Sequence, residues 1–579
     1  MKAKGIQAFY VNGSDPHLSE YLPARWQTRA FISGFTGSYG WLAITLSDAA
    51  LWTDSRYFLQ AEQQLKDTGI SLMKARLPET PDVTDWLISK LSANDKVGIN
   101  SECIAFSLFR KMKEAFSAKE IQVTKIGDLL NDIWENRPAV PSNEIFEHEL
   151  KFAGESRKSK ISRIQKELQR IGADMQILTA LDDIAWTFNL RGSDIEYNPV
   201  FLSYALIDQK KVILFANPDA ISEKLKEELT RDDIQLYKYS SVFCFLKEIK
   251  AFSKIYIDPD KTNLLVVSAI PSSCSIIEGI SISCQLKAQK NRIEIANIGN
   301  AMIKDGVALV EFWNWLENIV GTKTVTEYDI ALKLGEFRQN KKDFKGESFF
   351  PIIGYKEHGA IVHFHVEKDN ALTIEKDGIL LFDSGGHYLD GTTDTTRTIA
   401  LGIPTEKQKS DFTLALKGVI ALTKSVFPEN TRGYHLDVLA RKALWKHGLN
   451  YGHGTGHGVG FYLNVHEGPM SIRMEFNDQT IKEGMVLSNE PAFYREGEYG
   501  IRTENMMVCV EKDNTQFGRF LGFETLTLCP TDIRLIATEL LTDNEIEWIN
   551  NYHNKVFEKL SPALPAELHD FLFEKTRPI

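Results

Sequence analysis

The chain of 579 residues is too long for one hydrophobic core, and at roughly 100–200 residues per domain about two to four domains are expected. Apolar residues make up 43% of the sequence and charged residues 25%, as in ordinary globular proteins. The net charge of -11 argues against nucleic acid as a main partner, because phosphate binding needs a basic surface. No stretch approaches the roughly 18 apolar residues that span a bilayer, so no membrane partner is expected.

Cysteine is sparse, and its pattern excludes two classes of site. None of the six cysteines forms a CxxC pair, which rules out zinc-ribbon and thioredoxin-like sites. The first residues, MKAKGIQAFYVNGSD, lack the apolar run of a signal peptide. Few cysteines without a signal peptide predict a protein of the reducing cytoplasm.

Strand-like and helix-like stretches alternate in the first segment, which predicts an α/β layer. The expected elements are a hairpin at 41–54, a helix at 55–65 with Ser55 as its cap, a helix at 83–91 and a strand at 96–100. The segment ends at RPAVPSN (137–143), where two prolines in a polar run indicate a linker.

A second segment repeats this plan, which indicates two copies of one fold. The expected elements are a helix at 155–173, a strand at 175–181, a hairpin at 201–217, a helix at 221–229 and a strand at 254–258. The first of these helices is basic and amphipathic, and its charges are interpreted as a solvated face rather than a binding patch.

The character of the chain changes near Lys290. Two amphipathic helices are expected at 292–320 and 326–340, and after them strands and glycine-rich turns carry nearly all the residues capable of chemistry. The fold class is therefore α/β (α+β). The predicted domains are two similar α/β domains at 1–137 and 138–288 and a catalytic domain at 289–579.

Two aspartates flank a predicted chain reversal in ILLFDSGGHYLDGTTDTTR. Asp383 ends an apolar strand, and Asp394 begins another after glycines that suit a hairpin-like return. Strands folded back in this way place both carboxylates side by side, where a bound cation relieves their repulsion. Polar strand ends at an ordinary turn remain the alternative for this pair alone.

Three histidines and two glutamates complete the candidate set. His453 and His457 lie in YGHGTGHGVG and His466 in NVHEGP, although a single histidine in a glycine loop is more often structural. Glu490 lies at a strand exit in MVLSNEPAFY. Glu504 lies inside an apolar strand, where a carboxylate is costly unless it is paired or bound to metal. Arg502, two residues away on the same strand face, is the alternative salt-bridge partner of Glu504.

Taken together, these residues have the chemistry of a two-metal hydrolase. The carboxylates of Asp383, Asp394, Glu490 and Glu504 carry the charge that two divalent cations neutralise. Oxygen ligands with one imidazole suit Mn²⁺ or a similar ion. Two such ions share a water or hydroxide and hold a tetrahedral intermediate between them.

These motifs resemble the pita-bread metallopeptidases, which include methionine aminopeptidase, prolidase and aminopeptidase P. The chain is most similar to the long, three-domain cytosolic Xaa-Pro aminopeptidases. The resemblance covers nearly the whole chain and rests on IQAFYVNGSDPHLSEY, FISGFTGSYG, LWTDSRYFLQA, LDDIAWTFNLRGSDIEYNPVF, DSGGHYLDGTTDTTRT, HGTGHGVGFYLNVHEGP, NEPAFY and WINNYH. It implies an enzyme that removes the first residue from peptides with proline in second place, and a homodimer formed through the C-terminal domain.

The resemblance also implies the role of each residue. Its metal ligands are Asp383 for one ion, Asp394 and Glu504 bridging both, and His457 and Glu490 for the other. Its substrate-binding residues are His363, His453 and His466, with Tyr494 and Arg502 as partners that orient the ligands. His358 and His365, beside His363, match no role in the family.

We expect a hydroxide that bridges the two metals to attack the carbonyl of the first residue. Glu490 then passes a proton to the proline nitrogen, while His453 and His466 donate hydrogen bonds to the oxyanion. Two alternatives remain. A prolidase would share the metals but accept only dipeptides, and a non-catalytic pita-bread module would bind without turnover.

Overall fold

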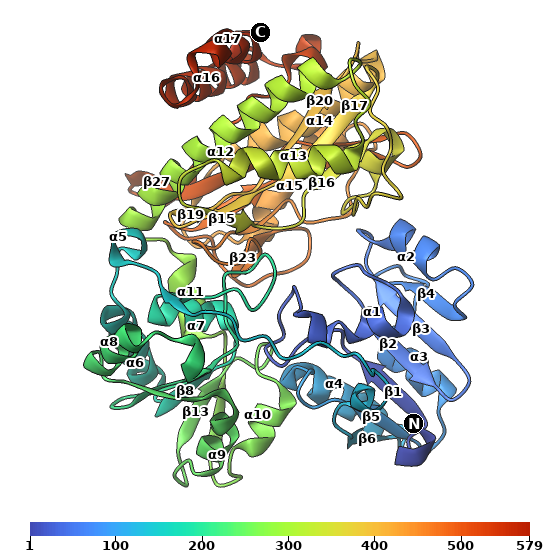
Figure 1. Cartoon of the computed structure of the whole chain (residues 1–579), viewed down its shortest axis with the longest axis vertical. Coiled ribbons are helices and arrows are strands. Elements are labelled where there is room, and N and C mark those ends of the chain that lie inside the picture. The colour runs from blue at the N-terminus through green and yellow to red at the C-terminus, as the bar shows by residue number, and fades with distance from the viewer. The chain divides into compact units, whose positions relative to one another are not determined.

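The first 125 residues form a six-stranded sheet with the order β4-β3-β2-β1-β5-β6 in the computed structural model, which describes residues 1–579 (Figure 1). Its strands are β1 (Ala8–Val11), β2 (Trp41–Thr45), β3 (Ala49–Thr53), β4 (Ile70–Lys74), β5 (Lys96–Ile99) and β6 (Gln122–Lys125). Its helices are α1 (Thr28–Ser33), α2 (Phe58–Gln64), α3 (Val83–Lys90) and α4 (Phe106–Ser117). The predicted hairpin at 41–54 is confirmed as β2 and β3, which pair antiparallel.

A second sheet repeats this topology with the order β12-β11-β10-β8-β13-β14. Its strands are β8 (Met175–Leu178), β10 (Tyr204–Asp208), β11 (Val212–Ala216), β12 (Ile234–Lys238), β13 (Lys254–Ile257) and β14 (Ser275–Glu278). Here β8 pairs antiparallel with β10 and parallel with β13, as β1 pairs with β2 and β5 in the first sheet. The predicted pair of similar α/β folds is confirmed.

One local prediction in this part of the chain is wrong, and a second holds only in part. Helix α2 begins at Phe58 and not after Ser55, because the Asp54–Arg56 ion pair, at 2.9 Å, holds the intervening residues in a turn. In α6 (Arg157–Ile171), the predicted solvated face is confirmed for the exposed Lys158, Lys166 and Arg170, whereas Arg157 and Lys160 are buried. Lys160 donates to the carbonyl of Trp186 and to Asn189 Oδ1, so its ammonium group is hydrogen-bonded inside the protein.

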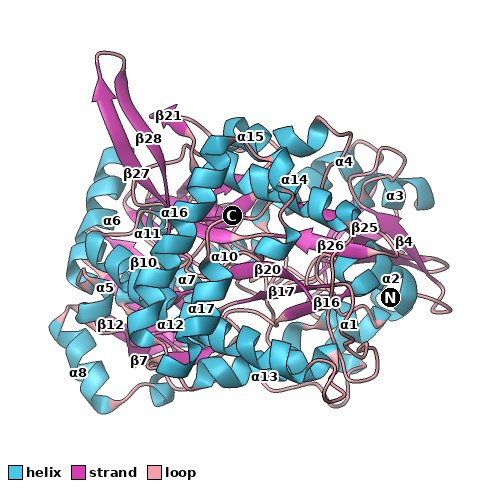
Figure 2. Ribbon diagram, turned by 90° about the horizontal axis from the view of Figure 1, so that it is seen from above, coloured by secondary structure: helices cyan, strands magenta, loops and turns pink.

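The rest of the chain forms the part that carries the candidate site. One small sheet has the order β16-β17-β20, and a larger one the order β21-β28-β27-β24-β22-β23. Their strands are β16 (Ile352–Tyr355), β17 (Ile379–Ser384), β20 (Thr395–Ala400), β21 (Val426–Pro428), β22 (Gly456–Gly458), β23 (Glu467–Ile472), β24 (Val486–Asn489), β27 (Asn505–Thr515) and β28 (Gly518–Thr525). Strands β27 and β28 form a long hairpin whose tip extends beyond the rest of this sheet (Figure 2).

Helices cover these sheets and bury the central strands. They are α12 (Arg292–Ile319), α13 (Glu327–Gln339), α14 (Glu406–Thr423), α15 (Gly433–Trp445), α16 (Asp543–Leu560) and α17 (His569–Thr576). Helix α12 begins at a capping box formed by Asn291 and Glu294, and its apolar residues pack with β17 and β20 in one core cluster. Both long helices predicted after Lys290 are confirmed.

The chain divides into two compact units. The first comprises Met1–Leu150 and Glu155–Leu286, and the second Lys151–Gly154 and Lys287–Ile579. The three-domain boundaries drawn from the sequence stay predictions. None of the helices combines the length and the apolar character that crossing a membrane requires.

A partly buried carboxylate lies on an edge strand of a small sheet in the second unit. Glu347 ends β15 (Phe344–Glu347), and its Oε1 is buried without a hydrogen-bond partner. Burial raises the pKa of Glu347 from 4.5 to about 7, although the nearby charge of Arg338 acts to lower it. The protein therefore favours the neutral form of this side chain.

We expect Glu347→Gln to stabilise the protein increasingly as the pH rises. Because the pKa is raised on folding, the contribution of Glu347 is complete below about pH 4.5 and is lost as the pH rises through about 7. The amide cannot ionise, so the gain in free energy of unfolding should approach about 3 kcal/mol above about pH 8. Thermal unfolding midpoints of both proteins across this range test it, and a gap that does not change with pH contradicts it.

Candidate metal centre

Asp383 and Asp394 are brought together by two antiparallel strands. Asp383 lies on β17 opposite Thr396 of β20, and Asp394 immediately precedes β20. Between them, β18 (Gly386–Tyr388) and β19 (Gly391–Thr392) form the predicted return. A Cβ at Gly385 would meet the carbonyl oxygen of Thr393 at 1.9 Å, so this close return needs glycine.

The larger sheet supplies the other candidate ligands. His457 lies on β22, and Glu490 lies at the exit of β24 as predicted. Glu504 lies just before β27 and not inside a strand, because the chain turns there from β26 (Tyr499–Arg502) into β27. Ligand atoms of Asp394, His457 and Glu504 all lie within 4.8 Å of one another. His457 Nε2 lies 3.4 Å from Asp394 Oδ2 and 3.7 Å from Glu490 Oε1.

Arg502 is not the direct partner of Glu504 that the strand pattern indicated. Its guanidinium donates to Asp383 Oδ2 at 2.6 Å, to the Tyr494 hydroxyl at 2.5 Å and to Thr396 Oγ1 at 3.1 Å. Thr396 in turn donates to Glu504 Oε2 at 2.8 Å. Arg502 therefore fixes one aspartate directly and one glutamate through a threonine.

Burial and mutual repulsion act together on the carboxylates. Burial, followed by the charges of Asp394 and Asp383, raises the pKa of Glu504 well above its usual value. Burial also raises the pKa of Glu490 to about 7, against the opposing charges of His457 and Arg502. Although burial lowers the pKa of His457, its hydrogen bond to Asp394 and the charge of Glu490 raise that pKa to about 9. The cluster holds more negative charge than Arg502 and His457 can balance.

The donor set fits divalent cations. Asp383 Oδ1 is buried and has no hydrogen-bond partner, so this oxygen is available to bind a cation. The other candidate donors are carboxylate oxygens and one imidazole, which suit Mn²⁺-like ions. The nearest cysteine in the sequence, Cys509 on β27, has a thiol whose pKa burial raises to about 12, so it supplies no thiolate.

The remaining histidines occupy different places. His453 Nε2 lies 2.9 Å from the Tyr494 hydroxyl, and its Nδ1 lies 3.8 Å from Glu490 Oε2. The ring of His466 meets that of His457 edge to face, with centroids 4.4 Å apart. His363 is half-buried in the segment between η6 (Lys356–Ala360) and β17.

Two hydroxyl residues in the cluster were missed by the sequence analysis. Thr396 links Arg502 to Glu504, and Ser488 receives a hydrogen bond from the backbone N–H of His457 while its own hydroxyl lies 3.3 Å from Glu490 Oε1. Each lies two residues from an expected ligand. Because side chains alternate along a strand, that spacing was the available signal.

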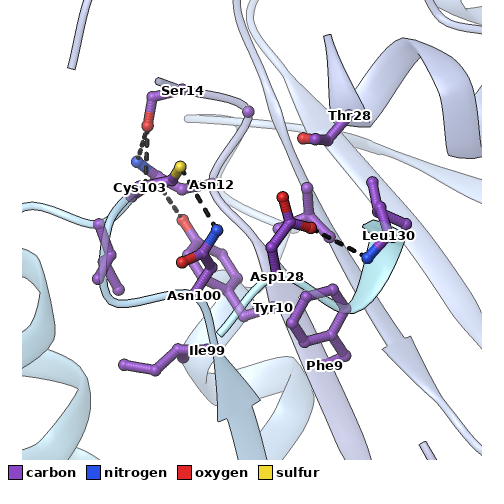
Figure 3. A pocket seen from close by; sticks show the side chains of 13 residues that line it. Phe9, Tyr10, Asn12, Ser14, Thr28, Ile99, Asn100, Cys103, Asp128 and Leu130 are labelled. Atoms are coloured by element: carbon purple, nitrogen blue, oxygen red, sulfur yellow. Dashed lines mark hydrogen bonds between the residues drawn. The ribbon is translucent and has the colours of Figure 1, made fainter. Parts of the chain in front are cut away.

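A separate cavity lies in the first unit, at the carboxyl ends of the parallel strands β1 and β5 (Figure 3). Asn12, Ser14 and Asp128 are among the residues that line it. Its volume of about 30 Å³ holds a water molecule or two and is far too small for a peptide. The carboxylate cluster remains the candidate site.

Family models match nearly the whole chain, including the part that carries the carboxylate cluster. Residues 1–133 and 136–294 each match a Creatinase/Prolidase N-terminal domain, 296–511 match metallopeptidase family M24, and 519–579 match the C-terminal region of peptidase M24. Xaa-Pro aminopeptidase 1 of Dictyostelium discoideum is 40% identical over 583 residues, which cover 97% of this chain and 92% of that protein. The chain belongs to the Xaa-Pro aminopeptidases of metallopeptidase family M24.

Solved structures extend the comparison. An X-prolyl aminopeptidase of Caenorhabditis elegans, described as a cytosolic enzyme with a di-nuclear active site, superimposes with a TM-score of 0.95 at 33% identity, covering 99% of this chain and 95% of that one. An Xaa-Pro dipeptidase of Bacillus anthracis gives 0.53 at 22% identity and covers 65% of this chain and 99% of that one, which shows the shared fold alone. The predicted fold class and the assignment as a metallopeptidase, a hydrolase, are therefore confirmed.

Proposed function

We propose that this enzyme hydrolyses the bond between an N-terminal residue and a following proline, with two divalent cations held by the carboxylate cluster. The observation that carries the proposal is the convergence of Asp394, His457 and Glu504 within 4.8 Å, beside Asp383 and Glu490. The di-nuclear active site of the C. elegans relative supports two ions. The oxygen-rich donor set supports Mn²⁺ as their identity.

The ligands divide between the two ions. In this proposal Asp383 would hold one ion, His457 and Glu490 would hold the other, and Asp394 and Glu504 would serve both. Bound there, two divalent cations supply a hydroxide nucleophile at neutral pH and polarise the scissile carbonyl. The buried hydrogen bonds from Arg502 and Thr396 hold these carboxylates in place before substrate arrives.

The chain's own side chains handle the proton and the developing charge. Glu490, at the exit of β24 and 3.7 Å from His457, accepts a proton and passes it to the leaving proline nitrogen. His453 and His466, close to Glu490 and His457 respectively, donate hydrogen bonds to the oxyanion. Tyr494 holds His453, and His363 contributes a wall for the pyrrolidine ring.

The proposed location and oligomeric state rest on similarity to relatives. We infer that the enzyme acts in the cytoplasm, as the C. elegans relative does by its description, and that it forms a homodimer as the family resemblance implies. Peptides that begin with Xaa-Pro are its substrates.

The first prediction concerns the bridging carboxylates. Asp394→Ala and Glu504→Ala should each abolish both metal loading and activity, because each removes a ligand shared by the two ions. Metal content per chain and hydrolysis of an Xaa-Pro-Xaa tripeptide with added Mn²⁺ measure the two effects. Cys509→Ser is the matched control on β27 and should retain both. Full activity in either carboxylate variant would rule out a two-metal site.

The second prediction separates the histidines by role. His453→Ala and His466→Ala should keep both metals but lose on the order of 10²–10³ in kcat, as enzymes do when an oxyanion donor is removed. His457→Ala should instead lose metal first. The same metal and turnover assays apply. Loss of metal from the His453 or His466 variant would show that the ligand histidine has been misassigned.

The third prediction concerns specificity. Acetylating the substrate's amine, or replacing its proline with alanine, should each lower kcat/KM by orders of magnitude, because the amine and the ring fix both sides of the reacting bond. Adding residues after proline should have little effect. A peptide series varied in these three ways provides the measurement. Cleavage of the bare Xaa-Pro dipeptide alone would identify a prolidase.

A further inference from the structure

A buried ion pair on α15 lies behind the loop that carries His453. Arg441 Nε donates to Asp437 Oδ2 at 2.6 Å, and each residue is 1% exposed. They stand one helical turn apart, on the face of α15 that is turned into the second unit. Neither side chain is among the metal ligands or substrate contacts proposed above.

The guanidinium of Arg441 spans the loop between α15 and β22. Beyond Asp437, it donates to the carbonyl of Tyr451 at 2.6 Å, to Asn450 Oδ1 at 3.0 Å and to the carbonyl of His453 at 2.7 Å. It also lies over the Tyr451 ring, 3.8 Å from the centroid. One side chain thus contacts three positions of the loop, including the backbone of His453 itself.

The second oxygen of Asp437 fixes the far end of the same loop. The Thr455 hydroxyl donates to Asp437 Oδ1 at 2.5 Å and also meets the Tyr451 hydroxyl at 2.5 Å. The carbonyl of Thr455 accepts the backbone N–H of Glu490 at 2.8 Å. The pair on α15 is therefore joined by direct bonds to the backbone of one proposed catalytic histidine and, through Thr455, to the backbone of Glu490.

The glycine content of this loop makes its conformation depend on contacts such as these. Gly452, Gly454 and Gly456 alternate with His453 and Thr455, and each glycine widens the range of backbone conformations available. A buried ion pair is at the same time weak evidence for stability, because desolvation of the two charges offsets their attraction. The hydrogen bonds from this pair to the loop therefore matter more than the attraction between its two charges.

We propose that Asp437 and Arg441 are positioning residues that hold the His453 loop in the orientation required to meet the substrate. They act through His453, whose ring is fixed at its other end by Tyr494. The inference rests on the proposed function, since His453 is there a substrate contact.

The first test is structural and needs neither metal nor turnover. In Arg441→Met, backbone amides 450–456 of the metal-free protein should exchange with deuterium faster than in the native protein, because the loop loses its anchor. The matched control is Arg338→Met, which breaks the buried Arg338–Asp305 pair of the same unit, where Arg338 is 0% and Asp305 1% exposed. It should leave exchange of 450–456 unchanged. Unchanged exchange in Arg441→Met, or an equal change in both variants, overturns the proposal.

The second test asks whether the pair acts through His453. Arg441→Met should lower kcat/KM for an Xaa-Pro-Xaa tripeptide by about 10- to 100-fold with metal content retained, whereas Arg338→Met should not. In a His453→Ala background, Arg441→Met should cause no further loss. An equal loss in both backgrounds overturns the proposal.

A milder variant covers the case in which Arg441→Met fails to fold. Thr455→Val removes only the hydroxyl bonded to Asp437 and Tyr451, and it should change loop exchange and kcat/KM in the same directions by less. No change in either measurement overturns the proposal. Failure of the proposed function is recognised separately, by a native enzyme that does not cleave Xaa-Pro-Xaa or by a His453→Ala variant with full turnover, and the exchange test stands in both cases.

Discussion

Repulsion among four closely placed carboxylates is the constraint on which the second unit depends. Asp394, Glu490 and Glu504 lie around the imidazole of His457 with Asp383 close to Asp394, and burial together with the charges of its neighbours raises the pKa of Glu504 well above its usual value. Holding like charges together in the interior costs free energy, so the surrounding structure has to be rigid and the site gains strongly from bound cations. The two antiparallel strands β17 and β20 and the glycine at 385 provide that rigidity on one side.

On the other side, buried arginines hold the backbone that carries the proposed ligands. Arg397, next to Thr396, donates to the carbonyl of Glu504, to Asn505 Oδ1 and to the Tyr552 hydroxyl on α16. It also donates to the carbonyls of Cys529 and Pro530. The C-terminal segment is therefore joined by direct hydrogen bonds to the strand end that presents Glu504.

Much of this arrangement could be predicted from the sequence where it depends on local chain reversal. Asp383 lies near the end of one strand and Asp394 just before the start of the next, and glycine-rich turns join them, so their proximity follows from local chain reversal. The partner of Arg502 could not be read in that way. Arg502 lies on β26, and its partner Asp383 lies on β17. Only the tertiary structure shows that these two strands are neighbours. Likewise, the burial of Lys160 depends on Trp186 and Asn189, which lie far along the chain.

The ligands alone leave the choice of substrate open, because the alternative activity, a prolidase, would use the same metal set. A bond to proline offers no N–H to recognise, so selectivity has to come from side chains that face the ring and the chain beyond it. The candidates, His453 and His363, lie on loops, and loops are precise only when a rigid scaffold anchors them.

Both loops are anchored by a buried carboxylate. Asp437 serves the first, and Glu327 serves the second by accepting hydrogen bonds from the backbone of Tyr355 and Leu372 and by pairing with His358 at 2.8 Å. His358, which matches no family role, thus has a structural one beside His363. The same device, a buried acid bonded to loop backbone and side chains, fixes the two segments on which selectivity for proline would depend.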